Sequence, residues 1–186
     1  MTTFSLVTTI LALVIFAGFV TLSVVKFGWQ KSYSAFAPKW TEAVPIDNHT
    51  RLWSIVTFVV ALLLAFGMIE QGEGHPWQAL GFFAPLYLMV VSYTPEYQDQ
   101  PGDDDKMRAK RKRQRIIHYI GTILCAAVSA VWLFLAGPRG IFFFSLMAAL
   151  VAGIVTRSIN SSLIFWAEMA MFGAVFAARL IGGLAL

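Results

Sequence analysis

Two charged side chains, Glu168 and Arg179, lie within the last apolar stretch of the chain, residues 161–185. In a helix, their spacing turns both side chains to one face, roughly 16 Å apart along the axis, which is too far for a direct ion pair. Charges inside a membrane are costly and usually face protein or water. Glu168 and Arg179 could be two polar sites along one pathway through the membrane. Alternatively, Glu168 lies near the inner interface and the long side chain of Arg179 extends outward to water. Both interpretations stay open for Glu168, which we expect to face the protein interior or a hydrated crevice. For Arg179 we favour the outward position.

A hydroxyl, an imidazole and a carboxylate could together act on a lipid, and the chain supplies Ser32, Ser34, His118 and Glu168 for such chemistry. The motifs that would make this assignment specific are absent from the sequence, which has no HExxH, Gly-x-Ser-x-Gly or Gly-rich phosphate loop. We therefore assign no catalytic residue and lean against an enzyme.

The histidines and the cysteine do not suggest a metal or haem site. His75 falls on the opposite side of the predicted membrane from His49 and His118, so no pair meets at mid-depth. The single cysteine, Cys125, lies inside an apolar stretch and cannot form an intrachain disulfide or a cysteine cluster. We predict no cofactor and no metal, and we expect His118 to hydrogen-bond the loop beside it.

One stretch, Asp103 to Arg115, carries seven of the fourteen Lys and Arg residues. Asp103 is a good helix N-cap after Pro101-Gly102, so the stretch predicts a helical extension that leads into the next apolar segment. Positive charges beside apolar segments indicate membrane orientation rather than nucleic-acid binding. We predict that the stretch binds anionic lipid headgroups through Lys106, Arg108, Lys110, Arg111, Lys112, Arg113 and Arg115.

The composition indicates a membrane protein. The chain is 58% hydrophobic and 13% charged, whereas soluble domains average about 25% charged residues. It contains six apolar stretches, each close to the roughly 20 residues that cross a bilayer as a helix. The predicted fold is all-α, a single polytopic domain over residues 1–186 with six transmembrane helices at about 3–25, 52–70, 77–95, 116–136, 140–156 and 161–185.

Loop charges predict the orientation of these helices. With the 96–115 loop on the inner side, that side holds twelve of the fourteen Lys and Arg residues. The N-terminus lacks the basic start of a cleavable signal peptide. We expect a protein of the plasma (inner) membrane, with both termini outside and the basic 96–115 loop in the cytoplasm.

Small residues recur at four-residue spacing in the last three apolar stretches, as in Ala149 and Gly153. Such faces let helices approach closely in lipid. We expect a tight core of these three helices, with Gly173 on a packing face, and Trp40, Trp53 and Trp132 at the membrane interfaces. Pro85 breaks the third stretch, either as a packing kink, which we favour, or as a bend that lines a cavity.

Two segments are similar to those of a known group of proteins. Residues 31–38 (KSYSAFAP) and 118–121 (HYIG) resemble small bacterial six-helix membrane proteins of unknown function. More distantly they resemble the DRAM-like membrane family, which has a Ser-containing loop after its first helix and a His near a later helix start. The resemblance implies the six-helix plan and no established catalytic residues.

The preferred function is that of a non-enzymatic integral membrane protein, as a pore or transport component or as a subunit of a membrane assembly. Two alternatives stay open: a membrane-embedded enzyme that acts on lipid, and a scaffold that binds anionic lipid. The expected partners are membrane lipids and, for a subunit, further copies of the chain or other membrane proteins. A hydrated cavity at Glu168 favours transport, and a cavity open to lipid where Ser, His and Glu converge favours an enzyme.

Overall fold

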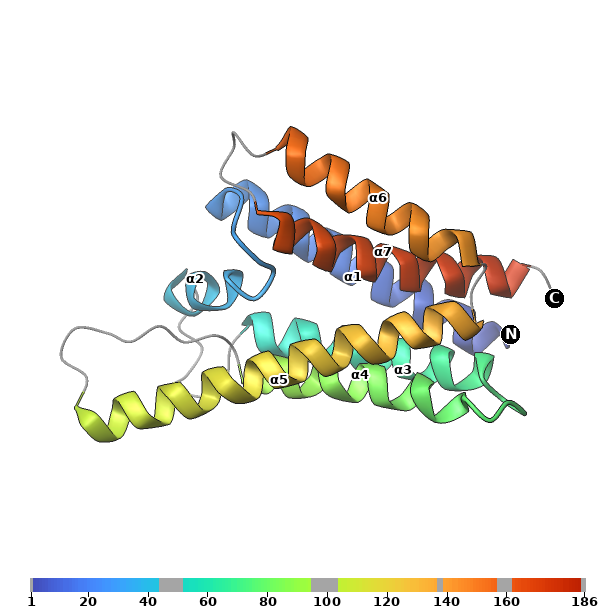
Figure 1. Cartoon of the computed structure of the whole chain (residues 1–186), viewed down its shortest axis with the longest axis horizontal. Coiled ribbons are helices and arrows are strands. Elements are labelled where there is room, and N and C mark those ends of the chain that lie inside the picture. The colour runs from blue at the N-terminus through green and yellow to red at the C-terminus, as the bar shows by residue number, and fades with distance from the viewer. Residues whose placement is uncertain (1, 44–51, 95–103, 137–138, 157–161, 185–186) are drawn as a thin grey trace.

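The computed structural model describes residues 2–43, 52–94, 104–136, 139–156 and 162–184 (Figure 1). Within these ranges every regular element is a helix, which confirms the all-α prediction. The helices are α1 (Thr3–Phe27), α2 (Phe36–Ala43), α3 (Leu52–Gln71), α4 (Gln78–Tyr93), α5 (Asp105–Ala136), α6 (Arg139–Val155) and α7 (Leu163–Leu184).

Four of these helices, α1, α3, α5 and α7, are long and apolar enough to span a membrane. The other two apolar helices are shorter, since α4 has 16 residues and α6 has 17. At about 1.5 Å per residue they extend roughly 24–26 Å, less than the ~30 Å hydrocarbon core of a bilayer. The structure thus supports four predicted spans by length and composition, and six spans are not confirmed.

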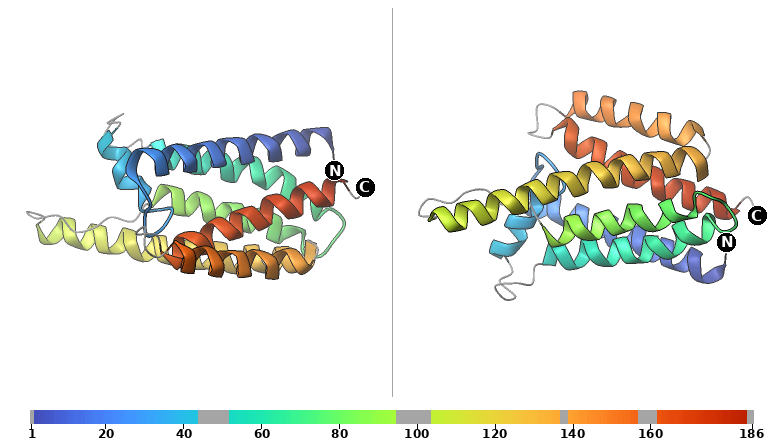
Figure 2. Two further views of the ribbon diagram at one scale, coloured as in Figure 1. Left: turned by 90° about the horizontal axis from the view of Figure 1, so that it is seen from above. Right: turned by 60° about the horizontal axis from the view of Figure 1, so that its bottom comes forward.

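The long helices run roughly along one axis of the molecule, and the chain reverses direction between them (Figures 1 and 2). Both termini lie at one end of the bundle. The first turns of α5 project beyond the other helices at the opposite end (Figure 1). The predicted helical extension of the fourth apolar stretch is therefore present. Asp104 caps this helix, since its Oδ1 accepts a hydrogen bond from the Met107 N–H at 2.6 Å, and the predicted cap, Asp103, lies outside the described residues.

Two glycines allow neighbouring helices to approach each other closely. A Cβ at Gly81 of α4 would lie 2.5 Å from the Met68 carbonyl oxygen of α3, so only glycine permits this approach. A Cβ at Gly153 of α6 would similarly lie 2.8 Å from the Leu163 side chain at the start of α7. The most extensive helix contacts are those of α3 with α4, α4 with α5, α6 with α7 and α1 with α3.

The prediction of one tight core from the last three apolar helices is therefore wrong. The helix α5 packs mainly on α4, and α6 packs mainly on α7. Gly173 is exposed, and a Cβ added there would meet nothing within 4 Å, so it does not serve as a packing glycine. The Ala174 and Ala178 side chains of the same helix are buried, as small residues on a packing face should be.

The short helix α2 was not predicted, and its tryptophan was expected at a membrane interface. Trp40 is instead buried: its indole N–H donates to Ser23 Oγ at 2.8 Å, and its ring stacks on Phe19. Trp53 and Trp132 are also fully buried. These three residues are therefore core side chains rather than interfacial anchors.

Candidate functional site

The connector between α1 and α2 places two polar side chains inside the bundle. Helix α1 stops at Gly28, whose φ of 71° favours glycine, and the Gly28 N–H donates to the Val24 carbonyl oxygen at 2.8 Å. The chain then turns inward at Tyr33 and Ser34, which are 4% and 5% exposed. The Trp53 indole N–H donates to the Tyr33 carbonyl oxygen at 3.2 Å and holds the connector against α3.

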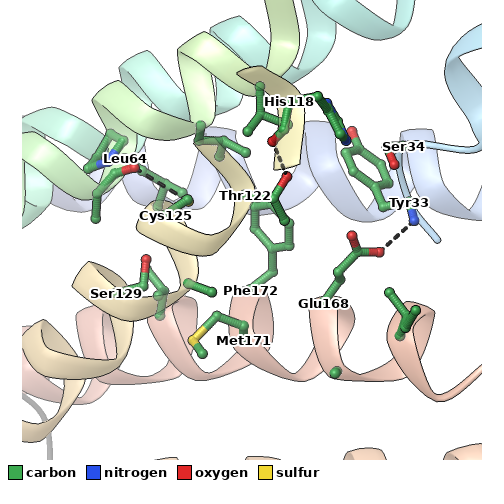
Figure 3. A pocket seen from close by; sticks show the side chains of 18 of the residues that line it. Tyr33, Ser34, Leu64, His118, Thr122, Cys125, Ser129, Glu168, Met171 and Phe172 are labelled. Carbon is green, nitrogen blue, oxygen red and sulfur yellow. Dashed lines mark hydrogen bonds between the residues drawn. The ribbon is translucent and has the colours of Figure 1, made fainter. Parts of the chain in front are cut away.

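A cavity of about 310 Å³ lies between this connector and helices α3, α4, α5 and α7 (Figure 3). Its walls are predominantly aliphatic and aromatic, and the titratable side chains Glu168 and His118 lie toward the connector, near Ser34 (Figure 3). The lining residues are Tyr33, Ser34, Trp53, Leu64, Met68, Ala84, Pro85, Leu88, Val91, His118, Thr122, Cys125, Ala126, Ser129, Ile164, Ala167, Glu168, Met171, Phe172 and Val175.

Glu168 points from α7 toward the connector (Figure 3). Its Oε2 atom accepts a hydrogen bond from the Tyr33 N–H at 2.6 Å. The Tyr33 hydroxyl lies 3.0 Å from Thr57 Oγ1 of α3. Burial raises the pKa of Tyr33 above its ordinary range, the bond to Thr57 lowers it, and the negative charge of Glu168 raises it further. The tyrosine is thus a neutral hydrogen-bonding group that ties three elements together.

His118 is buried at the start of the apolar part of α5, with 2% of its surface exposed. Its Nδ1 atom lies 2.7 Å from the carbonyl oxygen of Thr94, the residue that ends α4. A carbonyl oxygen only accepts, so Nδ1 carries the proton, and a neutral ring then has its lone pair on Nε2. The predicted hydrogen bond from His118 to the neighbouring loop is therefore present, and its acceptor belongs to Thr94, the first residue after α4.

The structure brings Ser34, His118 and Glu168 to one cavity, but it does not bring Ser32 there. Ser32 is half-buried, its Oγ lies 3.1 Å from Ser34 Oγ, and it accepts from the Ala35 N–H at 3.2 Å. Ser32 therefore shapes the connector, and Ser34 is the serine that faces the cavity. Glu168 lies where the sequence predicted, toward the interior, and its participation in a function stays a prediction.

Sequence reasoning missed a stripe of polar and small side chains on α5. His118, Thr122, Cys125 and Ser129 all line the cavity, at successive spacings of four, three and four residues. That spacing places side chains on one face of a helix, so the signal was present in the sequence. Pro85 of α4 also lines the cavity. This position agrees with the interpretation that we favoured less, in which the proline bends a helix that lines a cavity.

The cavity opens on one side of the bundle, between α5 and α7. Ala126 of α5 and both Ile164 and Ala167 of α7 line it and are exposed on the surface. The neighbouring surface of α5 is apolar, with Ile123 66% exposed. A molecule could therefore enter sideways across an apolar surface rather than from either end of the bundle.

Arg179 is not part of this cavity, and the expectation that it extends to water is wrong. It is 1% exposed, and its Nη1 donates to Gln71 Oε1 at 2.7 Å. Its Nη2 donates to Ser5 Oγ of α1. A Cβ at Gly67 of α3 would lie 2.6 Å from the guanidinium, so the absence of a side chain there makes room for it. Arg179 thus joins α1, α3 and α7 near the end where the termini lie.

The seven predicted headgroup-binding residues all lie on the first turns of α5. Most are exposed, and Arg111 and Arg115 are half-buried. Among the residues that the structure describes, no group of three or more His, Cys, Asp or Glu side chains could hold a metal ion.

No family model, curated protein or solved structure matches this chain. Its function is therefore inferred from the cavity and the helices around it.

Proposed function

We propose that the protein is a non-enzymatic integral membrane protein that binds a single-chain amphiphile in the cavity between α3, α4, α5 and α7. The observation that carries this proposal is the cavity itself, with predominantly apolar walls, Glu168 and His118 toward one end (Figure 3) and a side opening between α5 and α7. Ligand sites are typically about 300–1,000 Å³ and mostly apolar, with a few placed polar groups. A volume of about 310 Å³ suits one chain better than a two-chain phospholipid.

The proposed membrane placement uses all six apolar helices. The 17 residues of α6 reach the lower limit of roughly 17–25 residues for a span, and the 16 residues of α4 fall just below it. Local thinning of the bilayer accommodates short spans at modest cost. We place the basic end of α5 in the cytoplasm because twelve of the fourteen Lys and Arg residues then lie on that side.

This placement gives the ligand the orientation of a membrane lipid. His118 lies three residues after Arg115, so the polar end of the cavity is close to the predicted inner interface. Leu64, Ser129 and Val175 line the cavity further along their helices, toward the middle of the predicted spans. A head group near Glu168 and a chain directed toward the bilayer centre therefore match the depths that both parts occupy in lipid.

A lipid-modifying enzyme is the second candidate, because Ser34, His118 and Glu168 line the same cavity. An activated serine needs a base within hydrogen-bond reach, oriented by a third group. The observed bonds instead join Ser34 to Ser32, Glu168 to the Tyr33 backbone and His118 to the Thr94 backbone. These bonds stabilise the connector and the end of α4, and they favour binding over catalysis.

A pair of matched alanines tests the binding proposal. Ala126 lines the cavity at its opening, whereas its neighbour Ala127 is exposed and does not line it. We expect Ala126→Phe to weaken the binding of radiolabelled dodecanol or laurate to the protein in nanodiscs, after subtraction of empty nanodiscs. Ala127→Phe should leave binding unchanged. Equal binding of both probes to the two variants and the unaltered protein would contradict the proposed function.

A further inference from the structure

The cavity ends inside the bundle on the side away from the connector. On α5 its last lining residue is Ser129, and Trp132 and Leu133, one turn further on, are fully buried without lining it. On α7 the last lining residue is Val175, and Ala178, three residues later, is fully buried as well. Packed side chains therefore close the cavity before it reaches the end of the bundle where the termini lie.

Hydrogen bonds join the helices just beyond this closed end. Gln71 follows Met68, the last lining residue of α3, by three positions. Gln71 Nε2 donates to the Ala136 carbonyl oxygen of α5 at 3.0 Å, and Gln71 Oε1 accepts from Arg179 Nη1 of α7 at 2.7 Å. One amide thus connects three of the four helices around the cavity. Such bonds are strong inside a protein, where the dielectric is low, so the closed end resists a ligand that is too long.

Two dimensions of the cavity limit the chain that it can hold. Its volume is about 310 Å³. At about 30 Å³ for each carbon group, close to the volume of one water molecule in the liquid, this is room for roughly ten carbons. The lining residues of α5 run from His118 to Ser129, which is roughly 16 Å of helix. An extended chain advances roughly 1.2 Å per bond, so a chain that fills this length has about 13 bonds.

The side opening does not lengthen this space. Its exposed residues, Ala126, Ile164 and Ala167, all come before Ser129 and Val175 in the direction away from the connector. The opening therefore runs along the flank of a bound chain and not beyond its tip. A longer chain has to fold back on itself or push packed side chains apart, and overpacking of a core is unfavourable.

We infer that the cavity selects amphiphiles by chain length and takes a chain of about 10–13 carbons, with Ser129 at the position that limits this length. The inference rests on the proposed function, because it specifies the ligand of the same cavity. It concerns the chain alone and holds for any head group. Ser129 determines the limit because a small side chain at the closed end leaves room for the tip of the ligand.

Three straight-chain alcohols test the inference: octanol, dodecanol and hexadecanol. Nanodiscs with and without the full chain are equilibrated with each radiolabelled alcohol, and the excess bound per protein is measured against the mole fraction of alcohol in the lipid. This reference removes the general preference of longer chains for any apolar phase. We expect dodecanol to bind at least about tenfold more tightly than hexadecanol. The comparison uses the unaltered protein, so it does not depend on the folding of a variant.

Ser129→Leu supplies the second measurement, since the larger side chain fills part of the closed end. We expect it to lower the affinity for dodecanol about tenfold and that for octanol much less. Retained octanol binding also shows that the variant is folded. Ala127→Leu is the matched control on the same helix, because Ala127 is exposed and does not line the cavity, and it should change neither affinity. Unchanged dodecanol binding in Ser129→Leu would refute the limiting role of Ser129.

The failures of the two proposals are distinguishable. If hexadecanol binds as tightly as dodecanol, and Ala126→Phe weakens the binding of both, the length limit is wrong and the cavity remains the site. If the binding of none of the three alcohols depends on Ala126, the proposed function itself is overturned.

Discussion

The Tyr33 backbone N–H donates to Glu168 Oε2 at 2.6 Å, across 135 positions of sequence. The bond joins the connector after α1 to the first turns of α7. Non-helical backbone at membrane depth is tolerated where it is buried in protein or lines a cavity, and its polar groups must find partners there. Glu168 supplies such a partner, so this carboxylate has a structural role whatever ligand the cavity holds.

The first prediction concerns this bond. Glu168→Leu leaves the buried Tyr33 N–H without its acceptor, and we expect the free energy of unfolding to fall by about 1–3 kcal/mol. Glu168→Gln retains an accepting oxygen and should cost much less. Thermal unfolding in one detergent, followed by size-exclusion chromatography, measures both variants against Glu73→Leu as an exposed control. A Glu168→Leu variant as stable as the unaltered protein would refute the importance of the bond.

The helices themselves could be predicted from the sequence because hydropathy is a local property. The apolar stretches 3–25 and 52–70 correspond closely to α1 and α3. The interior position of Glu168 also followed from local reasoning, since a carboxylate within an apolar stretch is costly against lipid. These inferences needed no knowledge of which helices are neighbours.

The neighbours of each helix could not be predicted in this way. The small-residue pattern indicated close packing at Gly153, where it is found, but also at Gly173, where it is not, and it did not indicate the close contact at Gly81. Arg179 was expected to reach water because a charge is costly in the membrane, and its actual partners, Ser5 and Gln71, could not be foreseen since they are distant in sequence. A pattern along one helix shows which face can pack, but the choice of partner depends on the whole bundle.

The second prediction concerns the space above Gly67. A Cβ there would lie 2.6 Å from the Arg179 guanidinium, so Gly67→Ala forces this buried side chain to move. We expect a loss of about 1–3 kcal/mol in the free energy of unfolding. Gly173→Ala is the matched control, because a Cβ at that position meets nothing within 4 Å. There the better helix propensity of alanine should stabilise the protein by up to about 1 kcal/mol.

A double-mutant cycle shows whether the loss comes from Arg179. In an Arg179→Met background, the shorter side chain has no guanidinium at this position, so Gly67→Ala should cost much less. Thermal unfolding of the four proteins gives the coupling between the two sites. Additive effects of Gly67→Ala and Arg179→Met would contradict the close contact.

The third prediction concerns orientation. We expect the first residue of the described chain, Thr2, to lie outside the cell and Met107, in the basic extension, to lie inside. Single cysteines replace these two residues in a Cys125→Ser background, and a membrane-impermeant maleimide is applied to intact cells and to inverted vesicles. Thr2→Cys should react in cells and Met107→Cys in inverted vesicles. Labelling of Met107→Cys in intact cells would overturn the proposed orientation.

The fourth prediction concerns the basic extension of α5. The apolar part of this helix, residues 116–136, extends about 31 Å, which matches the ~30 Å core of a bilayer. Lys112 and Arg113 then lie within roughly 6 Å of the edge of the core, at headgroup depth. Lys106 and Arg108 lie roughly 12–15 Å from that edge, beyond the headgroups. Arg108 Nη1 also lies 3.8 Å from Asp105 Oδ1, which offsets part of its charge.

Two variants with the same change in charge separate these positions. Each Lys or Arg near an anionic surface contributes about 1 kcal/mol, so replacing Lys112 and Arg113 with Gln should weaken retention of phosphatidylglycerol roughly 30-fold at low salt. Replacing Lys106 and Arg108 with Gln should have a much smaller effect, because their charges are further from the headgroups and more strongly screened. Lipid retained after detergent washing is quantified by mass spectrometry. Equal losses in the two variants would show that α5 does not project from the membrane as proposed, since both pairs of charges would then lie equally close to the lipid.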